Sequence, residues 1–550
     1  MRSVFPQIKH RAAFISVLFL SGIVLFSIIA GCTASTASPS GSQPVQPATS
    51  DVVIPVDSPS ALTSTSAMQK GGVPASSLAY EGLVIKDRNG KFDPALAESW
   101  DVSPDAKTWT FHLAKTARWN DGVPFTCSDV KFTNDYMKSN NLTLGFVLKD
   151  VKSIDCPDEH TAVFTLKSSY SGFLDQISRQ PGISISPKHF WENVTDPQHY
   201  QDTRFIGTGP FVFAKAEPGY FRYAANDQYY GTVPKVSGVT LKVITNPDSR
   251  ILALKNGEID VVSGITPAVA QSLADEKNIG LYTIKDTGAY EVAFNMDQYP
   301  ANISGFRRAM SHAINRNAIS SLFGNGQPTE TTFLIPSLAG DYVNPDDIGM
   351  YNYDLTKAAE ILVDAGFTHN AGGSLIGPDG KPVTVGITLG GKAGAASEQK
   401  IVTVLKNDWE KLGITVTTVS YDDQTQYRKA INKNPVFIDG FPVTLHDDAD
   451  SLVNFAITPT QKSNYYNYNN PEYNTLVSLI QNTPDQKSIR TLSYQMQDLL
   501  AKDIPSVPVC TSDTIVAYRS DRFTGWDIGP GYHSVLDPKV LTNLVPVHAS

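Results

Sequence analysis

The stretch TWTFHL, Thr108–Leu113, has the alternating pattern of a strand that is buried on one face. Trp109, Phe111 and Leu113 point to one side of this strand, and the residues between them point to the other. Because His112 lies on the polar side, we expect it to be solvated rather than catalytic. We expect Trp109 to pack in the hydrophobic core, and we expect the same of two other nearby tryptophans, Trp100 and Trp119.

A turn and a helix follow this strand. The residues Asn120-Asp121-Gly122 mark the turn. Thr126 and Asp129 of the stretch TCSDV then have the spacing of a capping box, which predicts that a helix begins there.

Two later stretches repeat the mixture of helix and strand. NPDSRILALKNGEIDVV predicts a helix with Asp248 as its N-cap and a stop at Gly257, followed by a strand over residues 259–262. GFRRAMSHAINRNAIS predicts a helix with an apolar face of Phe306, Met310, Ala313 and Ile314, and with arginines available to solvent or partners, namely Arg307, Arg308 and Arg316. Such interleaving favours an α/β or α+β protein over a sandwich or a helical bundle.

Composition sets the broad class of the protein. The chain has 550 residues, which is too long for one ordinary hydrophobic core, so we expect at least two domains. It has 45 basic and 54 acidic residues and a formal net charge of −9. Because no run of lysines and arginines interrupts that acidic balance, nucleic acid is not expected as a partner.

The N-terminal segment has the layout of a secretory signal. Basic residues come first, an apolar run over residues 13–30 follows, and small residues precede Cys32. Ile29-Ala30-Gly31-Cys32 resembles the bacterial lipobox, whose cysteine is acylated and becomes the new N-terminus after cleavage. The alternative is an uncleaved anchor helix, since the apolar run is just long enough to span a bilayer.

The next segment predicts a tether. Residues 33–50, TASTASPSGSQPVQPATS, are small, polar or proline apart from Val45, so they cannot bury enough apolar surface to fold. We therefore expect a signal peptide over residues 1–31, a flexible tether over 32–50, and a globular part that begins at about Asp51. That part is expected on the extracytoplasmic face of the cell membrane, at the cell surface or in the periplasm, held by the acyl chains on Cys32.

The globular part carries successive motifs that resemble those of one family. In chain order they are YEGLV at 80–84, PALAESWDVSPDAKTWTFHL from 94, ARWNDGVPFTCSDVKF from 117, GTGPFVF from 207, ALKNGEIDVV from 253 and FRRAMSHAINR from 306. AAEILVDAGF and IPSVPV follow. Together they resemble the family 5 extracellular solute-binding proteins, the oligopeptide, dipeptide and nickel receptors of ABC importers.

The resemblance implies an architecture and a function. The implied fold is the α/β periplasmic-binding-protein-like fold of class II, with two lobes joined by crossover strands and an extra domain inserted in the first lobe. Lobe I is expected over 51–285 and 510–550, with the inserted subdomain at about 85–205, and lobe II over 286–509. The implied function is a monomeric, surface-anchored receptor that captures peptides in an interlobe cleft and delivers them to the permease by hinge closure.

The resemblance also indicates where ligand contacts are expected. The loop before YEGL contributes Met68 and Gln69, the stretch at 439–450 contributes Phe441, Thr444, His446 and Asp447, and the stretch at 509–513 contributes Cys510 and Ser512. Cys510 has the alternative of a small buried apolar side chain. Gly207, Gly209 and Pro210 are expected to set a turn or a lobe crossing rather than to bind phosphate.

One position departs from the peptide-binding members of the family. Their aspartate that pairs with the α-ammonium of the ligand falls here on Thr444 or Leu445, depending on the alignment, and neither is acidic. A buried ammonium without a carboxylate is unfavourable by several kcal/mol. Asp439, His446 or Asp447 can compensate from nearby; the alternative is that the aspartates at 447, 448 and 450 form a solvated turn.

Other chemistry finds less support in the sequence. A calcium loop is not expected, because the glycine and the distant glutamate of an EF-hand are absent, and no two cysteines or histidines have zinc-ligand spacing. Cys127 and Cys156 can form a disulfide in an oxidising compartment, although spacing does not fix the geometry.

No cofactor and no enzymatic activity are expected, since hydrolase motifs such as G-x-S-x-G and H-E-x-x-H are absent; a secreted lipoprotein hydrolase is the alternative to a receptor. Within the receptor class, an oligosaccharide or a nickel chelate are the alternatives to a peptide.

Overall fold

A computed structural model describes most of the globular part of the chain. The described residues are 50–57, 76–87, 91–142, 148–178, 183–200, 204–324, 326–329, 333–390, 395–421, 423–442, 449, 451–452, 465–483, 485–526 and 534–547. The predicted signal peptide, Cys32 and nearly all of the tether lie outside these residues, as do Met68, Gln69, Thr444, His446 and Asp447.

Lobe I is built on a four-stranded sheet of order β1-β10-β9-β8, which comprises β1 (Asp51–Val56), β8 (Phe211–Glu217), β9 (Tyr220–Ala225) and β10 (Gly238–Val243). β1 pairs with β10 in parallel, and the other neighbours are antiparallel. The helices of this lobe are α2 (Ser76–Ala79), α6 (Pro247–Lys255), α7 (Pro267–Leu273) and α17 (Pro538–Asn543). The short strands β19 (Phe523–Thr524) and β20 (Val545–Pro546) pair near the C-terminus.

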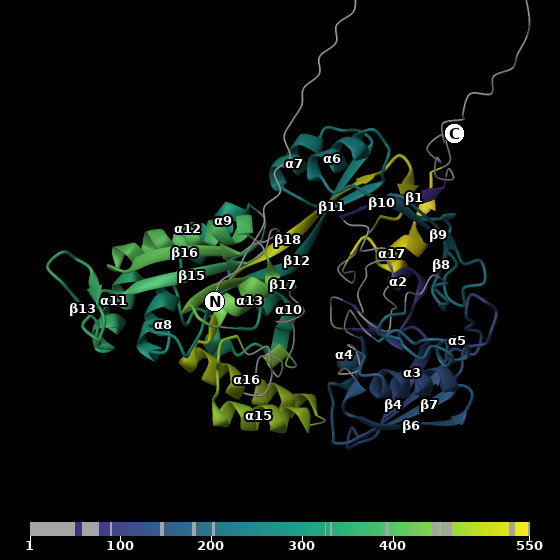
Figure 1. Cartoon of the computed structure of the whole chain (residues 1–550), viewed down its shortest axis with the longest axis horizontal. Helices are drawn as coiled ribbons and strands as arrows, with labels where there is room; N and C mark the ends of the chain where they lie inside the picture. Colours follow the sequence, from purple (N-terminus) through teal and green to yellow (C-terminus); the bar gives the residue numbers. More distant parts are fainter. Residues whose placement is uncertain are drawn as a thin grey trace, which may run out of the picture. The chain divides into compact units, whose positions relative to one another are not determined.

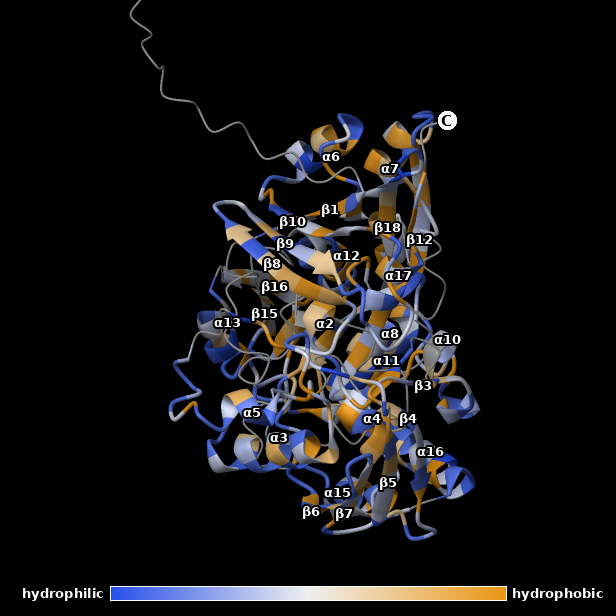
Figure 2. Cartoon of the chain, turned by 90° about the vertical axis from the view of Figure 1, so that its right-hand side faces the viewer, coloured by the Kyte–Doolittle hydropathy of each residue, from blue (hydrophilic) through white to orange (hydrophobic). Residues whose placement is uncertain are grey.

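An inserted domain forms a second, antiparallel sheet of order β4-β5-β7-β6, made of β4 (Ala97–Val102), β5 (Thr108–Leu113), β6 (Val151–Asp158) and β7 (Thr161–Leu166). The helices here are α3 (Cys127–Ser139), α4 (Phe173–Ser178) and α5 (Lys188–Trp191), and a two-stranded ladder joins β2 (Val84–Lys86) to β3 (Phe92–Pro94). α3 carries both hydrophobic and hydrophilic residues, and its apolar residues join the core of this domain (Figure 2).

Several predictions for the inserted domain are confirmed. Trp109, Phe111 and Leu113 are buried, whereas His112 is half-exposed and pairs with Asp101 at 2.9 Å. Thr126 is the N-cap of α3, and its N–H donates to Asp129 Oδ2 at 3.0 Å, as the capping box predicts.

The cysteines and tryptophans of this domain serve the fold. Cys127 and Cys156 form a disulfide, which ties the start of α3 to β6. Trp119 is fully buried and Trp100 packs against the same core. The predicted core-packing role of these tryptophans is therefore confirmed.

A six-stranded sheet of order β11-β18-β12-β17-β15-β16 runs into lobe II. Its strands are β11 (Val261–Ile265), β12 (Ile279–Phe294), β15 (Thr384–Gly390), β16 (Thr415–Tyr421), β17 (Val436–Pro442) and β18 (Ser506–Arg519). β12 and β18 pair along almost their whole lengths, from Ile279 opposite Arg519 to Ala293 opposite Ser506 (Figure 1). These two long strands are the predicted crossover strands, and the expected lobe boundaries at 285 and 510 fall inside them.

Lobe II also contains helices, which pack on its sheet or on one another. They are α8 (Ser304–His312), α9 (Arg316–Phe323), α10 (Pro336–Ala339), α11 (Leu355–Asp364), α12 (Ala395–Lys411), α13 (Gln424–Ile431), α15 (Pro471–Gln481) and α16 (Gln486–Asp503), with the 3-10 turns Gly340–Tyr342 and Pro345–Asp347. A small ladder pairs β13 (Thr368–His369) with β14 (Leu375–Ile376). The predicted apolar face of Phe306, Met310, Ala313 and Ile314 lies in the main core of this lobe.

Three local predictions were wrong. The N-cap of α6 is Asn246, whose side chain accepts from Ser249 N at 2.9 Å with Pro247 at the first helical position, so Asp248 lies inside the first turn. The helix predicted over 305–320 is two helices, α8 and α9. The strand predicted over 259–262 begins two residues later, as β11.

The prediction that Arg307 is available to solvent was also wrong. Its guanidinium is buried and donates to Asp503 O at 2.7 Å and to Ala301 O at 2.6 Å. Asp503 is the last residue of α16, so Arg307 satisfies a carbonyl that the helix leaves without an intrahelical partner. Arg316 is half-buried against the carbonyls of Tyr351 and Pro508, whereas Arg308 is exposed as predicted.

Candidate functional site

Two of the stretches expected to contact ligand meet on the central strand of the sheet. Phe441 of β17 is paired with Ala289 of β12, and Ser512 of β18 is paired with the neighbouring Gly288 on the opposite edge of β12. Residues from 441 and from 510–512, which are about 70 positions apart in sequence, therefore lie at one level of the sheet. Whether they contact a solute stays a prediction.

Cys510 packs as an apolar side chain. It is fully buried in the core of lobe II, and burial raises the pKa of its thiol to about 12. This is the packing of the small buried hydrophobe that the sequence left as an alternative. Ser512 is half-buried, and the intervening Thr511 accepts a hydrogen bond from Gln327 N at 3.0 Å.

Asp439 lies close to this level of the sheet and is one of three neighbouring acidic residues, with Glu291 and Glu398. It is paired across β12 and β17 with Glu291, and Arg428 of α13 lies 3.5 Å from its carboxylate. The guanidinium of Arg428 also lies 4.4 Å from the ring centre of Tyr465. Burial raises the pKa of Asp439, and the charge of Arg428 partly offsets that effect.

The other two acidic residues, Glu291 and Glu398, are buried. Glu291 is 0% exposed and accepts from the Tyr466 hydroxyl at 2.5 Å, and Glu398 accepts from Gly390 N at 2.7 Å. Burial raises the pKa of each to about 7. Asp439, with a side chain that is 23% exposed, is thus the carboxyl group of the three with the most open surface.

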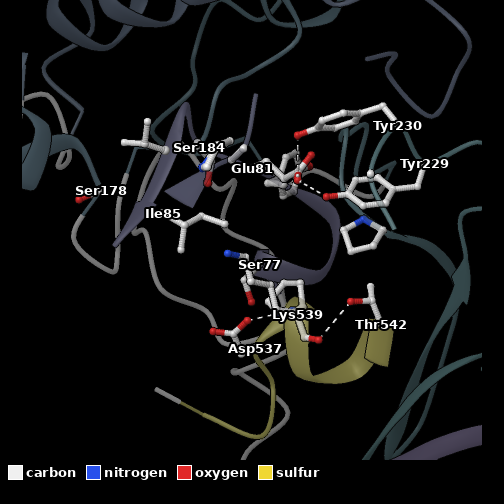
Figure 3. A pocket seen from close by; sticks show the side chains of 18 of the residues that line it. Ser77, Glu81, Ile85, Ser178, Ser184, Tyr229, Tyr230, Asp537, Lys539 and Thr542 are labelled. Carbon is white, nitrogen blue, oxygen red and sulfur yellow. Dashed lines mark hydrogen bonds between the residues drawn. The ribbon is translucent and has the colours of Figure 1, made fainter. Parts of the chain in front are cut away.

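A cavity of about 720 Å³ lies within lobe I. Its walls come from α2 and β2, from the β3–β4 connection, from the end of α4, from residues 229–232 and from α17 with the residues before it. In Figure 3, Tyr229 and Tyr230 point toward Glu81, and Asp537, Lys539 and Thr542 line another part of the wall. Sequence reasoning missed this cavity, because its walls come from seven separate parts of the chain, Thr116 and Pro210 included.

Glu81, from the YEGLV motif, is a buried acid in the wall of this cavity. Its Oε1 accepts from the hydroxyl groups of Tyr229 at 2.6 Å and Tyr230 at 3.2 Å. Its Oε2 has no hydrogen-bond partner among the described residues. Burial raises the pKa of this carboxyl to about 7, although the tyrosine hydroxyls and that of Thr208 favour its charged form.

The GTGPF segment packs against the backbone just before Glu81. Gly209 N donates to Ala79 O at 2.9 Å, and a Cβ on Gly207 would lie 1.8 Å from that same carbonyl oxygen. Glycine is therefore required at 207 for close backbone approach, which agrees with the predicted structural role of this segment. The packing holds the connection between α2 and β2, which carries Glu81, against the GTGPF segment.

Within the described residues, no group of three or more histidine, cysteine, aspartate or glutamate side chains has an arrangement that would hold a metal ion. Within the same residues, no helix is long and apolar enough to cross a membrane.

Comparison with known proteins gives a consistent result. The sequence model of the bacterial extracellular solute-binding proteins, family 5 (middle region), matches residues 91–486. A Brucella ovis protein named as an ABC transporter peptide-binding protein is 29% identical over 386 residues, which is 66% of this chain and 67% of the relative. The nickel-binding periplasmic protein of Escherichia coli is 27% identical over 372 residues, 64% of this chain and 68% of the relative.

The fold is likewise shared with solved structures. The crystal structure of a periplasmic oligopeptide-binding protein of an ABC transporter from Thermotoga maritima superposes with a TM-score of 0.80, at 22% identity, and covers 91% of this chain and 100% of that one. At that identity the likeness concerns the fold, and it confirms the two-lobed α/β architecture expected from the sequence.

Proposed function

The chain belongs to the bacterial extracellular solute-binding proteins of family 5, and from that premise we propose that it captures a peptide outside the cytoplasm for delivery to an ABC permease. The match over residues 91–486 is the observation that carries the proposal, because it spans both the inserted domain and most of lobe II. The relatives are solute-binding proteins of transporters, so we infer binding without turnover, and a steady release of cleaved peptide would contradict it.

Delivery would depend on the two crossover strands. β12 and β18 form the antiparallel ladder between the lobes, with a register irregularity between Ile284 and Gly288. Closure about such strands buries a ligand between lobes, and a ligand that binds the closed state more tightly shifts the population toward it. The permease would then recognise the closed, loaded receptor.

Asp439 supports a peptide as the solute. Among the described residues it is the partly open carboxyl group closest in sequence to Thr444 and Leu445, where peptide-binding members carry their acidic anchor. Its charge is only loosely paired with Arg428, at 3.5 Å, so it can accept an α-ammonium group. A nickel chelate is the second candidate, since a nickel-binding protein is among the relatives.

Asp439→Asn tests the ligand class. We expect this change to lower the affinity for a tripeptide at least tenfold by isothermal titration, because it removes the charge that pairs with the ammonium. Asp364→Asn, at an exposed position in α11 of the same lobe, is the matched control and should bind as the unmodified protein does. Unchanged tripeptide affinity in Asp439→Asn, or tight binding of nickel–histidine without peptide binding, would contradict the peptide assignment.

We further propose that acyl chains on Cys32 hold the receptor at the membrane. The lipobox-like residues 29–32 and the polar segment that follows support this placement. In cells, Cys32→Ser should release the protein from the membrane fraction into the medium or the periplasm, as measured by fractionation. Persistent membrane retention of the variant would overturn the lipid anchor.

A further inference from the structure

We propose that Asp513 is a positioning residue of the hinge: its buried carboxylate holds a bulge in the neighbouring crossover strand and thereby restrains how the two lobes turn about that point. The inference rests on the proposed function, because hinge closure is part of it. It gives Asp513, which lies in the stretch expected to contact the solute, a role in the hinge instead.

The sheet around the crossover strands is narrowest at residues 512–514 of β18. Toward lobe I, β18 lies between β12 and β11, and β11 pairs with residues 515–518. Toward lobe II, the same edge of β18 pairs with residues 327–329: Thr511 N donates to Gln327 O at 2.8 Å, and Thr329 N donates to Val509 O at 3.4 Å. Among the described residues, no strand pairs with that edge at 512–514.

β12 carries a bulge at the same level. Regular pairing with β18 stops at Ile284 and resumes at Gly288, whereas β18 has only Asp513 between the partners of these two residues. β17 joins the sheet from Gly288 onward, and Figure 1 shows β11 at one end of the β12 and β18 pair and β17 at the other. A bulge interrupts the ladder and bends its strand, so this level, where the expected lobe boundary at 285 falls, is a natural pivot.

The carboxylate of Asp513 holds this bulge. Its Oδ1 accepts from the backbone N–H of Asp286 at 3.0 Å, and its Oδ2 accepts from the ammonium of Lys285 at 2.7 Å. The side chain of Asp513 is 2% exposed, whereas that of Lys285 is 69% exposed. Bulging takes the N–H of Asp286 out of the ladder, so the carboxylate supplies the acceptor that the ladder no longer provides.

Further contacts fix the shape of the bulge. Asp286 has a φ of 49°, in the left-handed region, and its Oδ2 accepts from the hydroxyl of Ser337 in α10 at 2.9 Å. Thr287 Oγ1 donates to Ser512 O at 3.0 Å and lies 2.7 Å from Thr514 Oγ1. A residue other than glycine stays in the left-handed region only where its surroundings hold it there. The backbone conformation of the bulge therefore depends on these side-chain contacts.

Turning of the lobes at this level requires new backbone dihedrals in the bulge. Such a change moves the donors of residues 285 and 286 away from Asp513, and a buried carboxylate that loses its donors is unfavourable. The contact thus favours one conformation of the bulge and restrains the angle between the lobes. Its removal should let the unliganded receptor sample a broader range of angles.

Pulsed electron resonance between two spin labels, one in each lobe, measures this range without any ligand. Leu252→Cys in α6 and Val363→Cys in α11 provide the labelling positions, because the native side chains there are 60% and 61% exposed. Cys32→Ser removes a competing thiol, and Cys510 is buried. The width of the distribution of distances between the labels is the quantity compared.

Asp408→Ala is the matched control for Asp513→Ala. Asp408 of α12 has a side chain that is 3% exposed and pairs with an exposed lysine, Lys411, at 2.9 Å, but it lies outside the hinge. We expect Asp513→Ala to broaden the distance distribution roughly 1.5-fold or more, and Asp408→Ala to leave the width unchanged. Urea unfolding of both variants separates a loss of stability from a loss of hinge restraint. Equal widths in the two variants would overturn the proposal.

Lys285→Met covers the case in which Asp513→Ala fails to fold. Lys285 is exposed, and its replacement leaves the hydrogen bond from Asp286 N to Asp513 in place. We therefore expect a smaller broadening than for Asp513→Ala, and none for the control Lys411→Met. A width in Lys285→Met equal to that of the control would contradict the role of the carboxylate contact.

Addition of the peptide trialanine separates this inference from the proposed function. If Asp513→Ala broadens the unliganded distribution but trialanine neither binds nor shifts it in the unmodified protein, the hinge role of Asp513 stands and the peptide assignment falls. If trialanine binds and shifts the distribution, but Asp513→Ala has the same width as Asp408→Ala, the peptide receptor stands and the hinge role of Asp513 falls.

Discussion

Glu81 of lobe I and Glu291 of lobe II are two versions of the same local arrangement. Each is buried, each accepts a tyrosine hydroxyl at 2.6 Å or 2.5 Å, and each has one carboxyl oxygen without a partner among the described residues. Burial raises the pKa of both to about 7. Glu81 lines a cavity of about 720 Å³, whereas Glu291 does not line that cavity.

The difference lies in what surrounds each acid. Glu291 sits on β12, between β17 and β18 in the middle of a six-stranded sheet, so backbone and side chains enclose it on all sides. Glu81 follows the four-residue helix α2 and faces segments of the inserted domain and the C-terminal helix, which leave space. The two acids therefore differ in the space that surrounds them, and they share the burial of one carboxyl oxygen and the direction of the pKa shift.

Loss of the disulfide should lower the stability of the inserted domain, which forms part of the cavity wall, and leave the stability of lobe II unchanged. Cys127→Ser removes a cross-link over 29 residues of the inserted domain, which we expect to lower the free energy of unfolding of that domain by about 3–4 kcal/mol. Hydrogen exchange should accelerate in α3 and β6 and stay unchanged in β15 and β16 of lobe II. Cys127→Ser/Cys156→Ser should behave like the single variant, and equal acceleration in both lobes would show that they are not independent.

The pH dependence of stability should reveal both glutamates in the unliganded protein. Because the folded pKa of each is raised from 4.5 to about 7, the folded state holds this proton more tightly than the unfolded state does. Each group therefore lowers the free energy of unfolding as pH rises from about 4.5 to about 7, by an amount on the order of 2–3 kcal/mol.

Urea unfolding between pH 5 and pH 8 measures this effect. Glu81→Gln and Glu291→Gln should each flatten the pH dependence, because glutamine does not titrate. An unchanged pH dependence in either variant would contradict the raised pKa of that glutamate.

The tyrosines give the smallest expected effect. Tyr466→Phe leaves Glu291 without its hydroxyl donor and should cost about 1–2 kcal/mol of unfolding free energy, measured by urea unfolding at pH 8. Tyr229→Phe should cost less, about 0.5–1 kcal/mol, because Tyr230 still donates to Glu81. If Tyr229→Phe loses more unfolding free energy than Tyr466→Phe, then loss of one hydroxyl donor destabilises Glu81 at the cavity more than it destabilises Glu291 in the sheet.

Much of the fold could be predicted from local sequence patterns. The alternation in Thr108–Leu113, the capping box at Thr126 and the order of the family motifs led to the correct strands, helices and two-lobed architecture. Predictions failed where a tertiary contact decided the outcome. Arg307 lies on an otherwise polar position of its helix, yet it is buried because the end of α16 offers it a carbonyl oxygen.

Less of the candidate site could be predicted. Phe441, Cys510 and Ser512 do come to one level of the sheet, because strand pairing brings distant stretches together. The raised pKa of Glu81 and its cavity had no signal in the sequence beyond the YEGLV motif, since the tyrosines that hold it lie about 150 residues away. Burial and an unpartnered oxygen are properties of the packed chain, not of any motif.

Native mass spectrometry of the purified protein tests the account most directly, by comparing its mass before and after denaturation and by identifying what is released. The account predicts one bound peptide per chain, with occupancy lost in Asp439→Asn and kept in Asp364→Asn. Release of a single non-peptide compound, or equal occupancy in the two variants, would contradict it. An empty protein that also fails to bind added tripeptides would contradict the receptor itself.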